Sequence, residues 1–153
     1  MQEQNRKSSF PIVMLLVSVV LWIASLSNVA FYLGNHESMK GLTVLILGSI
    51  FAPLDIRYCA AYANYVWLAA IVLLALRKKV VPVHAALWGL ALVAFSVKAV
   101  HVDEAGNTAD IVRYGAGFYL WYAAFSVATI GTFAGKNKER KATTLADGTK
   151  NDA

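Results

Sequence analysis

Four long apolar segments constrain this chain more than any other feature of its sequence. They are separated by short polar stretches and occupy residues 10–33, 58–76, 80–100 and 114–134. A helix of roughly 20 mostly apolar residues is long enough to cross the hydrocarbon core of a bilayer. Hydrophobic residues make up 58% of the chain, which is high for an ordinary soluble domain. The sequence therefore predicts an all-α integral membrane protein, an antiparallel bundle of four transmembrane helices.

Basic residues are concentrated on one side of these segments, and they predict how the chain crosses the membrane. Of the 14 Lys and Arg residues, ten precede the first segment, separate the second from the third, or follow the fourth. Lys and Arg collect on the cytoplasmic side of a membrane. Both termini are therefore predicted to be cytoplasmic, with residues 1–9 as a short segment and residues 135–153 as a disordered basic tail. The charge bias and the short loops favour a bacterial inner membrane.

The predicted external loop, residues 34–57, contains an unusual apolar stretch at residues 41–53. This stretch is too short to span a membrane and too apolar for a plain loop in water. It can form a short helix lying on the membrane, a re-entrant half-helix, or an external hairpin packed on the bundle. We favour the interfacial helix, although residues 43–46 are β-branched enough to form a strand.

Aromatic side chains gather at the predicted outer ends of the second and fourth segments. An aromatic belt at the level of the lipid head groups accounts for most of them. Trp67 and Trp121 lie roughly 12–15 Å into their segments at the helical rise, which is deeper than a belt requires. The alternative is a pocket in the outer leaflet for a lipid tail, a quinone or a partner helix. Its candidate residues are Tyr62, Tyr65, Trp67, Phe118, Trp121 and Tyr122.

Polar side chains within the apolar segments form a second candidate set. A polar group that faces lipid loses its hydrogen bonds, so these side chains are predicted to point inward and to pair between helices. Structural hydrogen bonding is their expected role, and a polar cavity between the first two helices is the alternative. Lys98 lies near an outer end, where its long stem lets the charge reach the surface. The set comprises Ser25, Asn28, Asn64 and Lys98.

Recognisable catalytic, redox and cofactor motifs are missing from the sequence. None of the four segments contains Asp or Glu, which disfavours a proton-coupled carrier. A single cysteine, Cys59, excludes an internal disulfide and a Cys-x-x-Cys pair. His36 and His101 with Asp103 or Glu104 are a weak candidate for a surface metal site, because their spacing is not diagnostic. No catalytic residue, no metal and no cofactor are predicted.

These observations favour a non-catalytic interaction protein, of the accessory-subunit or toxin-immunity type. Membrane lipid and either a membrane-protein partner or a second copy of the chain are the expected partners. No nucleic acid is expected, because the basic residues bracket apolar segments and do not form one patch. A small oligomeric transporter or channel, with a polar path along the Ser18–Asn28 face of the first segment and Asn64, is one alternative. The other is a membrane enzyme acting on a lipid or quinone near Lys98, His101 and Glu104.

Overall fold

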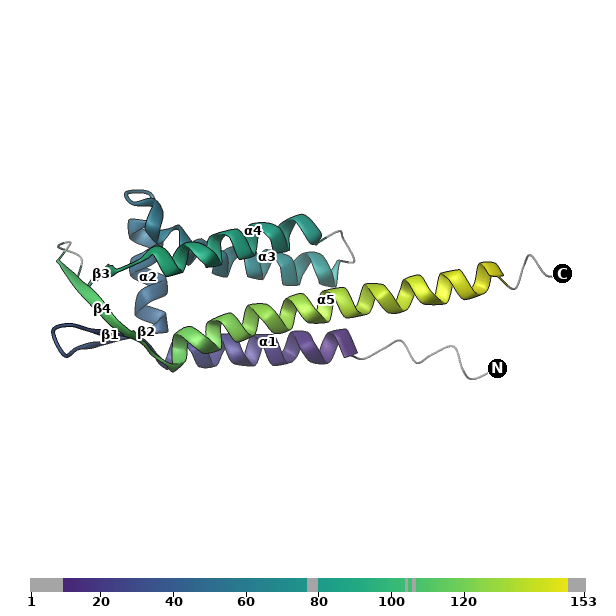
Figure 1. The fold of residues 1–153 in the computed structure, drawn as a ribbon, viewed down its shortest axis with the longest axis horizontal. Coiled ribbons are helices and arrows are strands. Elements are labelled where there is room, and N and C mark those ends of the chain that lie inside the picture. The colour runs from purple at the N-terminus through teal and green to yellow at the C-terminus, as the bar shows by residue number, and fades with distance from the viewer. Residues whose placement is uncertain (1–9, 77–79, 104, 106, 149–153) are drawn as a thin grey trace.

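The fold combines long helices with a small sheet at one end (Figure 1). The computed structural model describes residues 10–76, 80–103, 105 and 107–148. Helix α1 (Phe10–Ser27) packs along α5 (Ala116–Gly148), and α3 (Ala63–Ala75) packs along α4 (Val81–Val93). The axes of the four helices are nearly parallel, with α1 antiparallel to α5 and α3 antiparallel to α4, and the sheet caps one end of the group they form (Figure 1).

Three short helical elements connect the long helices to the sheet. Helix α2 (Gly41–Phe51) lies across the ends of the long helices, nearly at right angles to them (Figure 1). The 3₁₀ segment η1 (Ile56–Tyr62) leads directly into α3, and η2 (Ala94–Ser96) follows directly after α4. Asp55 begins η1, since its side chain accepts a hydrogen bond from the backbone N–H of Arg57.

The sheet has four antiparallel strands in the order β2-β1-β4-β3. The strands are β1 (Val29–Leu33), β2 (Ser38–Lys40), β3 (Ala99–His101) and β4 (Thr108–Tyr114). The central pair joins distant parts of the sequence, because Phe31 of β1 lies opposite Tyr114 of β4. His36 turns the chain between β1 and β2 with a φ of 68°, a left-handed conformation that is uncommon outside glycine.

The prediction of an antiparallel bundle of four transmembrane helices is wrong. A four-stranded sheet takes up chain that the prediction assigned to helices. Within the described residues, two helical stretches are long and apolar enough to cross a membrane, Ile56–Leu74 and Ala116–Ala134. These two are membrane-span candidates by length and composition, a test that the core helix of a soluble protein also passes. They give limited support to membrane association.

The error arose at the ends of the apolar segments, where strands replace helix. Hydropathy does not distinguish the two, and Val29, Phe31 and Tyr32 are of the β-branched and aromatic types that strands favour. Asn28 ends α1, because its side-chain Nδ2 donates to the Ala24 carbonyl oxygen over 2.8 Å. Its own carbonyl oxygen then accepts from the backbone N–H of Gly41 over 3.0 Å. The chain therefore leaves the helix six residues before the predicted limit at residue 33.

Other predicted boundaries also differ from the observed ones. The third segment, predicted as helix over residues 80–100, leaves the α-helical conformation after Val93 and ends in β3. Helix α5 runs on to Gly148, through most of the predicted disordered tail at residues 135–153. Ala, Lys, Glu and Arg are abundant in that stretch and are strong helix formers. Residues 1–9 and 149–153 lie outside the described part of the chain.

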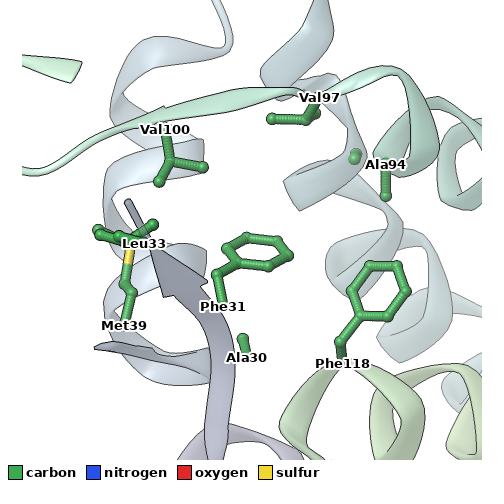
Figure 2. Packing of buried hydrophobic residues seen from close by; sticks show 9 residues of the cluster. Ala30, Phe31, Leu33, Met39, Ala94, Val97, Val100 and Phe118 are labelled. Atoms are coloured by element: carbon green, nitrogen blue, oxygen red, sulfur yellow. The ribbon is translucent and has the colours of Figure 1, made fainter. Parts of the chain in front are cut away.

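Buried apolar side chains form two cores. The sheet-side core fills the space between the sheet, α2 and the nearest helix ends (Figure 2). It contains Ala30, Phe31, Leu33, Met39, Ala60, Ala94, Val97, Val100 and Phe118. The helix-side core lies between the long helices and contains Ala63, Trp67, Leu87, Ala91, Ala124, Phe125 and Ala128. Small residues dominate the helix-side core, which lets the helix backbones approach closely.

Candidate ligand-binding site

A cavity of about 90 Å³ lies inside the sheet-side core, where the sheet, α2 and the ends of the long helices meet. Its walls come from α1, β1, β2, α2, η1, η2, β3 and the first turns of α3 and α5. The lining is almost entirely apolar and includes Phe31, Val44, Leu47, Ala94, Val97 and Phe118. In Figure 2, Ala94 and Val100 point toward Phe118 and Leu33. An apolar cavity of this order can stay dry and accept a small apolar molecule.

Glycines allow the elements around the cavity to approach one another. A Cβ atom on Gly41, the first residue of α2, would lie 2.3 Å from the carbonyl oxygen of Ser25 in α1. A Cβ atom on Gly48 would lie 2.9 Å from the Cβ of Ala61 in η1. Both distances are shorter than real Cβ contacts, so only glycine permits α2 to lie this close to α1 and η1. The position of α2 as a cavity wall therefore depends on these two residues.

Asn64 supplies the main polar group in the cavity wall. Its Oδ1 accepts hydrogen bonds from the indole Nε1–H groups of Trp22 and Trp121, each over 2.8 Å. Its Nδ2 donates to the carbonyl oxygen of Ala61 over 2.9 Å. The side chain is only 5% exposed and links α1, α3 and α5. An indole N–H can only donate, so the two tryptophans determine which end of the carboxamide is oxygen.

The helix-side core contains a second buried chain of hydrogen bonds, farther from the sheet than Asn64. The Ser18 hydroxyl donates to the carbonyl oxygen of Ala124 over 2.7 Å and accepts from the Trp67 Nε1–H over 3.1 Å. Trp67 also stacks on Trp22, with ring centroids 5.1 Å apart. This chain satisfies the polar atoms of a serine and a tryptophan that are almost completely buried.

At the far end of the helix-side core, two threonines of α5 hold the buried His84. Its Nε2 lies 3.1 Å from Thr132 Oγ1, and its Nδ1 lies 3.3 Å from Thr129 Oγ1. Trp88 donates its indole N–H to the same Thr129 oxygen over 3.1 Å. These contacts join α4 to α5. The hydropathy pattern does not predict which of these side chains pair with each other.

The cavity's rim next to β3 contains a stack of aromatic rings and an ion pair. His101 stacks on Phe51 and on Tyr58, with centroid distances of 3.9 Å and 5.1 Å. Nearby, Arg57 Nε donates to Asp55 Oδ2 over 2.9 Å. The hydrogen bonds from Arg57 hold the pKa of the Asp55 carboxyl below its usual value. The charges of Arg57 and Asp55 at the rim are thus paired with each other.

The structure separates the six aromatic residues of the predicted pocket. Phe118 and Trp121 line the cavity, whereas Trp67 belongs to the helix-side core. Tyr122 donates its hydroxyl to the carbonyl oxygen of Ala91 and stacks on Phe95. Tyr62 and Tyr65 lie next to each other, with centroids 6.2 Å apart, and Tyr65 is half exposed.

The four predicted polar residues also divide into two groups. Ser25 and Asn64 line the cavity, and the Ser25 hydroxyl donates to the carbonyl oxygen of Trp22 over 2.6 Å. Asn28 is exposed and caps α1, and Lys98 is exposed between η2 and β3. Asn28 thus bonds within α1, whereas Asn64 bonds to tryptophans of α1 and α5.

Several lining residues were not singled out by sequence reasoning, among them Ala94, Val97 and Met39. The apolar stretch at residues 41–53 was the sequence signal that could have indicated the cavity, because such a stretch requires an apolar surface to pack against. Across the described ranges, no three His, Cys, Asp or Glu side chains are grouped so that they could hold a metal ion. No known protein family, curated protein or solved structure matches this chain.

Proposed function

We propose that this chain is a small, non-catalytic membrane protein that holds an apolar ligand, or the apolar part of a larger molecule, beneath its sheet. The cavity is the observation that supports this proposal. The cavity has a volume of about 90 Å³, is partly open and is lined almost entirely by apolar groups, so its lining atoms lack packing partners on the side of the cavity. An apolar ligand in this space recovers the lost contacts, and the surrounding core is already formed to receive it.

We propose that the protein associates with a bacterial inner membrane through apolar helix surfaces, with the sheet at the outer surface and both termini in the cytoplasm. Large apolar side chains are exposed on every long helix, including Leu16 on α1, Val72 on α3, Leu92 on α4 and Ile130 on α5. Exposed apolar area of this extent is unfavourable in water. The concentration of Lys and Arg at the chain ends and at residues 77–79 supports this orientation.

Labelling of single cysteines in a Cys59→Ala background tests this orientation. We expect Asn35→Cys, in the turn between β1 and β2, to react with a membrane-impermeant maleimide added to intact spheroplasts. We expect Lys150→Cys, near the C-terminus, to react only after the membrane is permeabilised. The reverse pattern would overturn the orientation, and equal labelling of both in a soluble fraction would overturn the membrane location.

Filling the cavity tests the proposed binding directly. Ala94→Leu adds three carbon atoms at the cavity wall, so we expect it to weaken binding of methylcyclohexane by about ten-fold or more. The same change stabilises the ligand-free protein by about 1 kcal/mol, because it removes empty space. Titration calorimetry and thermal unfolding of the detergent-purified protein measure both effects.

Ala86→Leu is the matched control for this experiment, because Ala86 is exposed on α4 and does not line the cavity. We expect it to change neither binding nor the unfolding midpoint appreciably. Unchanged binding of methylcyclohexane in Ala94→Leu would show that the probe binds elsewhere and would contradict the proposal.

A second candidate function, binding of a membrane-protein partner, has one observation in its favour. Leu42, Ile46 and Ile50 are each about half exposed and form a stripe along α2, with Leu54 and Ile56 exposed beyond its end. An apolar stripe of this kind is typical of a helix that contacts another apolar surface. The double variant Ile46→Ser, Ile50→Ser is expected to lose a stoichiometric partner that purifies with the unmodified chain. Purification of the unmodified chain alone would remove this candidate.

A further inference from the structure

We infer that the ligand carries a carbonyl-type hydrogen-bond acceptor and that Asn64 recognises it from the cavity wall. This inference rests on the proposed function, because it describes the chemistry of a molecule bound in the same cavity. A ketone, ester, amide or quinone has such an acceptor, whereas a saturated hydrocarbon does not.

The hydrogen-bond inventory of Asn64 carries the argument. A carboxamide has two N–H donors and an oxygen that accepts two hydrogen bonds. Trp22 and Trp121 occupy the oxygen, and the Ala61 carbonyl oxygen takes one N–H. The Nδ2 atom is thus partnered through one N–H, and this hydrogen bond to the described residues leaves the second N–H available in a side chain that lines the cavity and is only 5% exposed. A ligand acceptor that reaches this N–H adds a hydrogen bond that the ligand-free site does not make.

The direction of this donor is set before any ligand binds. Rotating the carboxamide by 180° would turn its NH₂ group toward two indole N–H groups, which cannot accept a hydrogen bond. The two tryptophans come from α1 and α5, and Asn64 lies in the first turn of α3, where it bonds to the Ala61 carbonyl. Three helices therefore hold the amide in one orientation. A donor that is already oriented adds to affinity without the entropy cost of ordering it.

The remaining lining restricts the ligand further. Around the amide the walls are apolar, with the rings of Phe31 and Phe118 and the side chain of Val97 among them (Figure 2). A single neutral N–H does not compensate a buried negative charge, so a free carboxylate at this depth is disfavoured. Arg57 at the rim is already paired with Asp55. The cavity thus fits an uncharged, apolar group with one carbonyl oxygen.

A pair of isosteric probes tests the inference. Cyclohexanone and methylcyclohexane differ in having a carbonyl oxygen or a methyl group at the same position. We measure the affinity of both for the full-length protein in one detergent, for the unmodified chain and for Asn64→Leu. The ratio of the two affinities is then compared between proteins, which cancels the different solubilities of the probes. We expect the preference for the ketone to fall about three- to ten-fold in Asn64→Leu, the range expected for one hydrogen bond.

A second variant keeps the test valid if Asn64→Leu does not fold, because that variant leaves Trp22 and Trp121 without an acceptor. In Asn64→Asp, the buried carboxyl in its neutral form still accepts from both indoles. Its single O–H donates to the Ala61 carbonyl oxygen, so no donor remains for a ligand. We expect Asn64→Asp to lose the same preference for cyclohexanone while its unfolding midpoint stays close to that of the unmodified protein.

The outcomes separate this inference from the function on which it rests. If both probes bind the unmodified chain and the ratio is the same in every variant, the inference is overturned and the cavity remains a binding site. If neither probe binds the unmodified chain, the proposed function fails. Where a ligand is bound, mass analysis of an organic extract of the purified protein identifies it. The measured mass distinguishes a quinone from an ester-linked lipid as the molecule that carries the carbonyl. Recovery of a stoichiometric hydrocarbon without any carbonyl would also overturn the inference.

Discussion

Gly41→Ala is expected to lower the free energy of unfolding by about 3 kcal/mol, near the upper end of overpacking effects. The new Cβ would lie 2.3 Å from the Ser25 carbonyl oxygen and 3.1 Å from the Leu26 Cα. Both are backbone atoms of α1, so no side-chain rotation relieves the clash. Helix α2 would have to move away from α1 and break the 3.0 Å hydrogen bond from Gly41 N–H to the Asn28 carbonyl oxygen. Thermal unfolding of the detergent-purified protein measures the loss.

Gly89→Ala is the matched control, because it makes the same chemical change in a helix with free space around it. No atom of a neighbouring element lies within 4 Å of a Cβ placed on Gly89. Alanine in a helix interior is favoured over glycine by about 1 kcal/mol. We therefore expect Gly89→Ala to raise the unfolding midpoint while Gly41→Ala lowers it. Shifts in the same direction and of similar size would refute the close packing of α2 on α1.

Trp67→Ala is expected to destabilise the protein by about 4 kcal/mol, as for other large-to-small changes at buried aromatic residues. Trp67 is 1% exposed, stacks on Trp22 and donates its indole N–H to Ser18 Oγ. Its removal leaves a cavity and takes a donor from a buried hydroxyl. Leu68→Ala, at the next position with 44% of the side chain exposed, is expected to cost much less.

Trp67→Phe separates the two contributions to this effect. Phenylalanine retains much of the ring packing but has no N–H, so the loss attributable to the hydrogen bond is about 1 kcal/mol. Unfolding midpoints of the three variants at positions 67 and 68 are compared in one detergent. Equal effects of Trp67→Ala and Leu68→Ala would show that Trp67 faces the outside, which contradicts its place in the helix-side core.

Much of the helical part of the fold was accessible from the sequence, but the sheet was not. The apolar segments marked where long helices lie, because α1, α3, α4 and most of the apolar part of α5 fall inside them. Strands β1 and β3 were missed because they continue apolar segments that read as helix, and β2 and β4 because they lie almost entirely in stretches predicted to be external loops. Pairing of Val29–Leu33 with Thr108–Tyr114 depends on contacts between distant parts of the chain, which local periodicity does not encode.

The cavity was hidden for a related reason. Aromatic residues near the outer ends were identified as pocket candidates, and two of them, Phe118 and Trp121, line the observed cavity. Ten of the 22 lining residues are instead alanines, valines and glycines, whose importance depends on how α2 and the sheet fold over the helix ends. Asn64 was recognised as an internal polar group, but its partners are tryptophan indoles, which the sequence pattern does not pair with it.

The pairing of β1 with β4 has a consequence for the order of events during synthesis. Phe31 is made early, yet its partner Tyr114 and the cavity residues Phe118 and Trp121 emerge only near the end of the chain. The edge of β1 that pairs with β4 therefore has no partner until β4 has been synthesised. Contacts over such a long sequence separation form slowly. Closure of the cavity is thus a late step in the folding of the chain.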